Sequence, residues 1–432
     1  MTVAVMISER FIVAAPMHLE SRRKVAHGRC VPPGETIARI EALLRPRFDF
    51  RTHDERVSAH LHWTALFLDD DPGFRAMGKG ITPEFSRAGA LAEAAEWLTA
   101  REVDRLPGHL AAPQHKVENA LPIDSLVSHV ANATPPVLER IKSLDAAWHW
   151  VDGWSLRHAA PRKVPLSYVR LVNGPNGKAA GNCLEEAVVH AVNEIFERRA
   201  HITVLRDRLV VPTIDARSIK HPILRAHLAF FRDRRIDVTL KDLSFGGALP
   251  CVGAYFHDPH VPEDYQFHHF FKVGSSFDRE EALLRVFTEY VQGRRANEFL
   301  DGPGDPELAP LLKPDFRRLR TRGDDCDNFL SAFLFGMVPY RRADFLREGD
   351  LIPFDPHPGY GDCLDDIRHA LEICEALDKD LLVVDLTDPR LGFPVVQVVI
   401  PGYSDVLPFH PPHSPALFRP LTRSEVLHSF SP

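Results

Sequence analysis

Carboxylate side chains recur at helical spacing along residues 182–198. At about 100° per residue, Glu186, Glu194 and Glu197 fall within about 80° of one another, and the apolar residues fill the other arc. Asn182 stands at the edge of this face. Like charges on one face destabilise a helix unless cations neutralise them. The pattern indicates either a cation site or the solvated side of an amphipathic helix.

A second stretch with helical periodicity, residues 83–103, places Glu93 and Glu96 on one side at i,i+3 spacing. It follows residues 78–80, Gly-Lys-Gly, which predict a tight turn with a cation, Lys79, beside it. This triplet does not have the GxxxxGK[ST] spacing of a P-loop, so on its own it is weak evidence for phosphate binding.

A third helix, predicted over residues 279–300, places Arg285, Glu289 and Gln292 on one face, with Arg294 beyond them. Each of the three helices is explicable as a surface helix. Taken together they supply carboxylates for a hard cation and arginines for phosphate oxygens. Magnesium prefers oxygen ligands and is commonly shared between carboxylates and nucleotide phosphates. The combination predicts ATP chemistry without a P-loop.

Composition excludes several other classes of protein. The 432 residues carry a net charge of −7, with 44% hydrophobic and 26% charged residues, so we expect a large core and no nucleic-acid-binding basic surface. No run of about 18 apolar residues predicts a membrane span. The six cysteines are scattered without a CxxC pair, which argues against a zinc ribbon or a disulfide scaffold. We therefore expect a cytoplasmic location.

Helices and strands are interspersed along the chain, which predicts a mixed α/β or α+β fold with long helices flanking mixed sheets. Residues 107–136 are expected to be irregular, and 173–181 to form a glycine-bearing turn. Helices are predicted at 35–44, 83–103, 183–205, 219–234, 279–300 and 363–377, and strands at 61–68, 164–172, 236–240, 250–256, 267–273, 380–386 and 395–400.

These segments together resemble the YcaO family, ATP-using enzymes that activate peptide-backbone amides. Its motifs read roughly GKG…SALxExxER, NGxxAGNTxxEAxxxxxxExxER and ALxRxxTExxQGR, followed by PGxSD. The matching segments here are GKG at 78–80 with GALAEAAEW at 89–97, NGKAAGNCLEEAVVHAVNEIFER at 176–198, ALLRVFTEYVQGR at 282–294 and PGYSD at 401–405. Two positions depart from the pattern, Gly89 in place of serine and Trp97 in place of arginine.

The resemblance implies ATP and Mg²⁺ as cofactors and assigns roles to matching residues, although it names no catalytic residue. The implied magnesium carboxylates are Glu93, Glu96, Glu186, Glu194 and Glu197, and the implied nucleotide contacts are Lys79, Asn182, Arg198, Arg285, Gln292 and Arg294. The expected division is an N-terminal α/β segment at 1–75, a YcaO core at 76–305 and its C-terminal part at 306–432.

The family's chemistry implies a peptide or protein substrate and leaves the nucleophile open. An external sulfide gives a thioamide, a Cys, Ser or Thr side chain gives an azoline, and an amine gives an amidine. Residues 427–432 contain one terminal proline rather than the PxPxP tail of many azoline-forming members. We therefore expect thioamide formation or an accessory role in sulfur modification, with azoline formation and a non-catalytic peptide-binding protein as alternatives. A sulfur-delivery or leader-binding partner and a homodimer are compatible with this hypothesis.

Two further groups of residues suggest chemistry without matching a known spacing. The pairs His268-His269 and His410…His413 lack a cysteine or carboxylate at zinc-site spacing, so the sequence predicts no zinc there. Cys183 precedes the second motif helix, where it could be a reactive thiol. Threonine is common at that position in the family, so a capping or packing role is the favoured interpretation.

Overall fold

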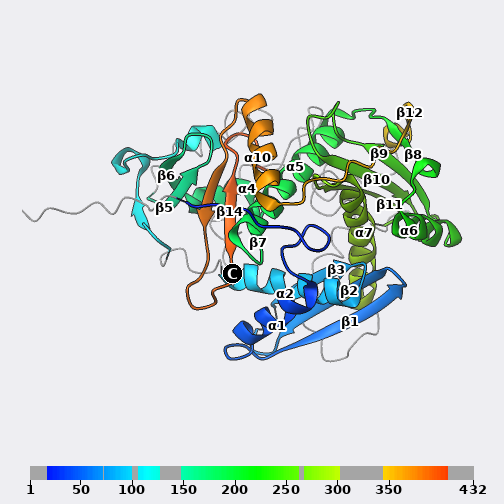
Figure 1. Cartoon of the computed structure of the whole chain (residues 1–432), viewed down its shortest axis with the longest axis horizontal. Coiled ribbons are helices and arrows are strands. Elements are labelled where there is room, and N and C mark those ends of the chain that lie inside the picture. Colours follow the sequence, from blue (N-terminus) through cyan, green and yellow to red (C-terminus); the bar gives the residue numbers. More distant parts are fainter. Residues whose placement is uncertain are drawn as a thin grey trace, which may run out of the picture.

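The computed structural model describes residues 17–71, 73–99, 106–126, 147–261, 267–301 and 344–406. Three sheets surround a set of central helices (Figure 1). The first sheet is antiparallel with strand order β1-β2-β3. Helix α1 precedes it and helix α2 follows it. The bounds are Pro33–Leu44 for α1, Phe50–Ser58 for β1, Leu61–Leu68 for β2, Arg75–Gly80 for β3 and Pro83–Thr99 for α2.

The second sheet has the order β11-β10-β9-β8-β12, in which only the pairing of β12 with β8 is parallel. Helices α6 and α7 belong to the same part of the chain. The bounds are Thr213–Asp215 for β8, Pro222–Asp233 for α6, Asp237–Asp242 for β9, Cys251–His257 for β10, His269–Ser275 for β11, Arg279–Asp301 for α7 and Leu351–Pro353 for β12.

The third sheet has the order β4-β5-β13-β14-β7, with β6 paired to β5. It joins strands from the middle of the chain to strands near its end. The bounds are Leu110–Ala112 for β4, Trp148–Ser155 for β5, Ala160–Pro165 for β6, Leu166–Asn173 for α4, Lys178–Ala180 for β7, Leu184–Asp207 for α5, Cys363–Ala376 for α10, Leu382–Asp385 for β13 and Val395–Val399 for β14.

Three helices each lie between two sheets. Helix α2 contacts β3 of the first sheet and β7 of the third, α5 contacts β7 and β14 of the third and β11 of the second, and α7 contacts β11 of the second and β2 and β3 of the first. These are the three helices that carry the motifs, so the arrangement of the sheets brings the motifs together.

The strand β2 shows why this arrangement is stable. All eight of its residues are buried. Leu66 and Leu68 join the core that α1 and α2 complete, whereas Leu61 joins the core beneath α7. Because side chains alternate across a strand, burial on both faces requires an apolar run rather than an alternating pattern.

The prediction of a turn at Gly78-Lys79-Gly80 is wrong, because these residues form the end of strand β3. The glycines are needed for close helix packing. A Cβ atom on Gly78 would lie 1.8 Å from the backbone oxygen of Ser86, and one on Gly80 would lie 2.5 Å from Cβ of Phe85. Helix α2 therefore rests directly on the backbone of β3.

The prediction of a strand at 164–172 is also wrong, because β6 ends at Pro165 and helix α4 begins at Leu166. Leu166, Val169 and Val172 are fully buried at a spacing of three, which is helical. Other predicted helices and strands are found with shifts of one to three residues at their described ends. The strands that were not predicted are β1, β3, β4, β5, β7, β8 and β12, and β6 overlaps a predicted strand only at its last two residues.

The expected division of the chain after residues 75 and 305 stays a prediction. Strand β3 begins at Arg75 and therefore spans the first boundary, and the third sheet joins β5 and β7, before the second boundary, to β13 and β14, after it. Among the described helices, none is both long enough and apolar enough to cross a membrane.

Candidate nucleotide site

A cavity of about 510 Å³ lies where helices α2, α5 and α7 meet. Strand β3, strand β7 and residues near position 29 complete its wall. Every predicted site residue except one lines it, namely Lys79, Glu93, Glu96, Asn182, Glu186, Glu194, Glu197, Arg198, Arg285 and Gln292. The fold therefore brings together side chains from three separate motifs.

Arg294 is the exception. It lies beyond the cavity on α7, where its guanidinium forms a close ion pair with the buried carboxylate of Asp258 and donates to the Tyr290 hydroxyl at 3.3 Å. The helical rotation between Arg285 and Arg294 is about 180°, which explains why the two arginines face different neighbours. The structure does not place Arg294 among the nucleotide-contacting candidates.

Each of three cavity carboxylates has a cation close to it. Glu96 lies 3.6 Å from Lys178, Glu194 lies 3.8 Å from Arg198, and Glu197 lies 3.9 Å from Lys272. Burial raises the pKa of Glu93, Glu96 and Glu194 above the ordinary carboxyl value. Burial therefore disfavours the charged forms of these carboxyl groups, and additional positive charge would stabilise those forms.

Lysines from two strands provide much of that charge. Lys79 on β3 forms a close ion pair with Glu289 of α7, and Lys272 on β11 lies 3.3 Å from the same carboxylate. Burial lowers the pKa of Lys79 to about 8 and that of Lys272 to about 7. Sequence analysis did not single out Lys272, although a lone lysine within an apolar strand was an available signal.

Lys178 occupies a special position beside the residue that departs from the family pattern. Its ammonium lies 3.9 Å from the centre of the Trp97 ring, within cation–π range, as well as 3.6 Å from Glu96. The indole nitrogen of Trp97 donates to Glu93 at 3.3 Å. A cation is therefore present where the family has an arginine, but it comes from β7 rather than α2.

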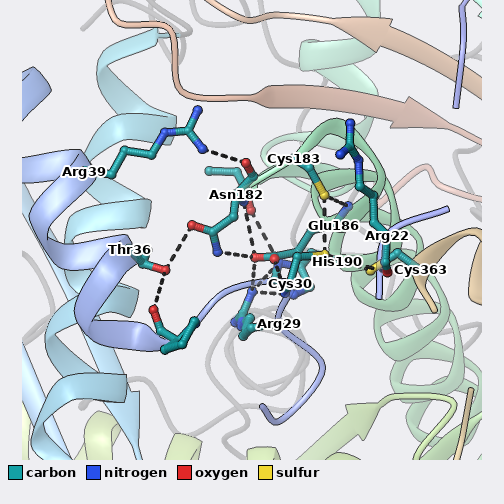
Figure 2. Close-up of polar contacts among 12 residues, drawn as sticks. Arg22, Arg29, Cys30, Thr36, Arg39, Asn182, Cys183, Glu186, His190 and Cys363 are labelled. Carbon is teal, nitrogen blue, oxygen red and sulfur yellow. Dashed lines mark hydrogen bonds and ion pairs between the residues drawn. The ribbon is translucent and has the colours of Figure 1, made fainter. Parts of the chain in front are cut away.

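Glu186 has protein partners for both carboxylate oxygens (Figure 2). One oxygen accepts from the backbone nitrogen of Cys30 at 2.8 Å, and the other accepts from the side chain of Asn182 at 2.9 Å and lies 3.5 Å from the Arg29 guanidinium. Thr36 in turn donates to the Asn182 oxygen at 2.9 Å. Here Glu186 anchors residues 29–30 against α5, and its role as a magnesium ligand stays a prediction.

Cys183 is the N-cap of helix α5, where its sulfur accepts from the backbone nitrogen of Glu186 at 3.4 Å. This is the capping role that the sequence favoured. Glu185, the neighbouring residue on α5, lies outside the cavity and is buried. Its carboxylate accepts a hydrogen bond from the backbone nitrogen of Glu20 at 2.7 Å and pairs with Arg22 at 3.4 Å.

The donor set fits magnesium and a nucleotide. Carboxylate oxygens are the ligands that Mg²⁺ prefers, and ammonium and guanidinium groups bind phosphate oxygens. The raised pKa values of the buried carboxylates add a physical reason for a metal, since a bound cation would remove the penalty on their charged forms.

Comparison with protein families agrees with this chemistry. Residues 77–404 match the family described as YcaO cyclodehydratase, ATP- and Mg²⁺-binding. The chain belongs to the YcaO family. The predicted family and the α+β fold are thereby confirmed, and the expectation of ATP and Mg²⁺ is confirmed at the level of the family.

Individual relatives are distant. An uncharacterized protein of Methanothermobacter thermautotrophicus is 24% identical over 395 residues, 87% of this chain and 95% of its own length. The ribosomal protein S12 methylthiotransferase accessory factor YcaO of Escherichia coli is 24% identical over 246 residues, 57% of this chain. That match, like one to a Haemophilus influenzae protein, covers only 39% of the relative's length.

Two solved structures share the fold. YcaO from Methanopyrus kandleri, bound with AMPPCP and Mg²⁺, has a TM-score of 0.62 at 21% identity, covering 89% of this chain and 95% of that one. A heterocyclase in complex with substrate and cofactor has a TM-score of 0.66 at 22% identity, covering 90% of this chain and 54% of that one.

Proposed function

We propose that this protein uses ATP to activate a backbone amide of a peptide or protein for sulfur insertion. The observation that carries the proposal is the convergence of Glu93, Glu96, Glu194 and Glu197 with basic side chains on one cavity between three motif helices. Such a set of charges suits phosphoryl transfer, where the protein contributes mainly positioning and charge neutralisation.

The residues divide into two groups by charge. Glu93, Glu96, Glu194 and Glu197 would hold Mg²⁺, which when bound neutralises phosphate charge and orients the oxygens. Lys79, Arg198, Arg285 and Gln292 line the cavity as donors to phosphate or nucleotide. A nucleophile adds to the amide carbonyl, the resulting oxyanion takes the terminal phosphoryl group, and phosphate then leaves in place of oxide.

Lys178 supplies the cation that the family places at position 97. Its contacts with both the Trp97 ring and the Glu96 carboxylate hold the ammonium at the end of the first motif, in the wall of the cavity. The loss of arginine at this position is therefore compensated from β7, which supports an active nucleotide site rather than a degenerate one.

Two products remain compatible with this site. Sulfur insertion is supported by the E. coli relative, which is described as an accessory factor of a methylthiotransferase. Azoline formation is supported by the structural neighbours described as heterocyclases and a microcin synthetase complex. The terminal residues that bear on this choice in the sequence, 407–432, lie outside the described part of the chain.

Intact mass spectrometry of a candidate substrate peptide co-expressed with this protein distinguishes the products. Thioamide formation exchanges oxygen for sulfur and adds about 16 Da, whereas azoline formation loses about 18 Da as water. A loss of water located at Cys, Ser or Thr would overturn sulfur insertion. An unmodified peptide, when ATP turnover is demonstrated, would indicate that a partner is missing, and we propose a sulfur-delivery or leader-binding protein as that partner. The homodimer stays a prediction.

A further inference from the structure

Three thiols meet beside the nucleotide cavity (Figure 2). The sulfur of Cys30 lies 3.4 Å from that of Cys183 and 3.4 Å from that of Cys363. They come from three places in the chain: the segment before α1, the N-cap of α5 and the first residue of α10. The nucleotide site described above uses none of these thiols.

Backbone hydrogen bonds hold the thiols in place. The nitrogen of Cys30 donates to Glu186 at 2.8 Å, and the nitrogen of Cys363 donates to the backbone oxygen of Arg22 at 2.9 Å. Cys30 and Cys183 are half-buried, whereas Cys363 is fully buried. Cys30 and Cys183 also adjoin Arg29 and Asn182, both of which line the cavity.

The ligand atoms of Cys30, Cys183 and Glu186 lie within 4.8 Å of one another, a spacing that suits a metal ion as well as sulfur chemistry. The N-termini of α5 and α10 both lie at the cluster, where the positive ends of the helix dipoles favour an anion. Contact with the neighbouring thiol and burial act in the other direction, because they raise the pKa of Cys183, and the pKa of Cys30 is also raised. Sulfur transfer needs one thiol that accepts sulfur and a neighbouring thiol that resolves the product, and Cys30 lies in contact with two such neighbours.

We propose that Cys30 accepts sulfur from a persulfide donor and that Cys183 releases it as hydrosulfide next to the nucleotide cavity. This inference rests on the proposed function, in which sulfide is the nucleophile. The Cys30 thiolate attacks the outer sulfur of R–S–SH, which forms Cys30–S–SH and expels the donor as a thiolate. The Cys183 thiolate then attacks the Cys30 sulfur, which expels HS⁻ and leaves a Cys30–Cys183 disulfide. A cellular dithiol returns the two thiols by supplying two electrons and two protons.

The test uses the purified full chain with inorganic polysulfide, without ATP or peptide. We expect an added mass of about 32 Da on Cys30, one sulfur atom, and then release of sulfide with formation of the disulfide. Cys30→Ser should lose both signals, and Cys183→Ser should keep the persulfide but release sulfide at least about tenfold more slowly. Cys251→Ser, which removes a buried thiol of β10, is the matched control.

Labelling of Cys30→Ser equal to that of the unmodified chain would overturn the proposal, as would a disulfide that forms without any persulfide. Unchanged sulfide release in Cys183→Ser would overturn the assignment of the resolving thiol. Because the assay omits ATP and peptide, its failure leaves the peptide-mass test unaffected, and the reverse also holds.

A second and independent observation concerns three histidines at the end of the β10–β11 pair. His257 and His269 are register partners, and His268 precedes β11. One ring nitrogen of each lies within 4.8 Å of one ring nitrogen of each of the others. Sequence analysis found no zinc spacing around His268-His269, because the third histidine is brought in only by strand pairing.

Nδ1 of each ring has an oxygen partner. Nδ1 of His257 lies 3.3 Å from Asp237, Nδ1 of His268 lies 2.8 Å from the backbone oxygen of Val261, and Nδ1 of His269 lies 2.5 Å from the Tyr255 hydroxyl. Metal-ligating histidines characteristically donate this nitrogen to a carboxylate, carbonyl or similar oxygen, which orients Nε2 toward the ion.

We infer that the three histidines bind Zn²⁺ through Nε2, with the fourth tetrahedral position taken by water. The test is metal titration of the full chain after chelation, with Co²⁺ as a spectroscopic probe. We expect one ion per chain, lost in His257→Ala and His269→Ala but retained in the exposed control His115→Gln. Cys30→Ser excludes binding at the cysteine cluster.

Retention of the ion in both His257→Ala and His269→Ala, its loss in Cys30→Ser, or the absence of binding in the unmodified chain would each overturn this assignment. Thermal unfolding of each variant checks that it is folded. The Co²⁺ spectrum reports tetrahedral coordination of the bound ion directly, so loss of that spectrum in a folded variant means loss of the ligands rather than unfolding.

Discussion

Replacing Lys178 by methionine tests whether this lysine supplies the cation missing at Trp97. Methionine keeps most of the apolar stem and removes only the charge. Two effects are expected to weaken binding of magnesium and nucleotide. The cavity loses a cation that phosphate oxygens can contact, and the buried Glu96 carboxyl, whose pKa burial already raises, retains its proton more readily and becomes a poorer metal ligand.

The magnitude follows from the geometry. A separation of 3.6 Å between Lys178 and Glu96 corresponds to about 5 kcal/mol of attraction at an effective dielectric constant of about 20. Desolvation offsets much of this, as the lowered pKa of Lys178 indicates. A net loss of about 1–3 kcal/mol remains, which raises Kd by about 5- to 150-fold.

The assay is calorimetric titration of a non-hydrolysable ATP analogue with and without Mg²⁺. The informative comparison is with the double variant that carries both Lys178→Met and Trp97→Arg. The second substitution restores the arginine of the family motif, so the double variant should recover most of the lost affinity. Lys163→Met is the matched control. Lys163 of β6 pairs with Asp152 of β5 at 2.6 Å and does not line the cavity. Unchanged affinity in Lys178→Met, or a folded double variant as weak as the single one, would refute the reasoning.

Three further predictions concern the same site. Glu197→Gln should reduce ATP turnover by at least about 100-fold while circular dichroism stays unchanged, and Glu185→Gln, outside the cavity, should keep turnover; equal losses would contradict the assignment of helix faces. Above about pH 8, Lys79→Arg should bind nucleotide more tightly than the unmodified chain, because Lys79, whose pKa burial lowers to about 8, loses its proton there whereas arginine does not; the comparison at each pH removes the opposite contribution of Glu96, whose pKa is raised to about 8, and equal affinities above that pH would contradict the role of Lys79. Gly78→Ala should lower the free energy of unfolding by about 3 kcal/mol or more, whereas Gly34→Ala should not destabilise the protein, because a Cβ added there meets open space. Similar denaturation midpoints for the two variants would refute the close contact of α2 with β3.

Local periodicity was sufficient to place most of the candidate site residues. Helical spacing alone grouped Glu186, Glu194 and Glu197, and the structure places all three along the cavity wall. It also indicated the fold class, since alternating helical and strand-like segments require mixed layers. Such patterns are readable from sequence because the side-chain direction in a helix or strand depends only on position along that element.

Short segments were predicted less well. The sequence could not distinguish a turn from a strand at Gly78-Lys79-Gly80, because the requirement for glycine there comes from the backbone of α2 rather than from the local chain. The stretch from Leu166 to Val172 was similarly ambiguous, because a few apolar residues fit either period. Which period applies was decided by the core against which they are buried.

The tertiary structure alone decided which charges meet. Lys178 and Lys272 come from strands β7 and β11, yet they lie beside Glu96 and Glu197 on helices α2 and α5. Helical rotation takes Arg294 away from the cavity, to Asp258. Sequence determines the faces of individual elements, whereas partners distant in the chain are set by how three sheets and three helices pack, and the pKa values of the buried groups follow from that packing.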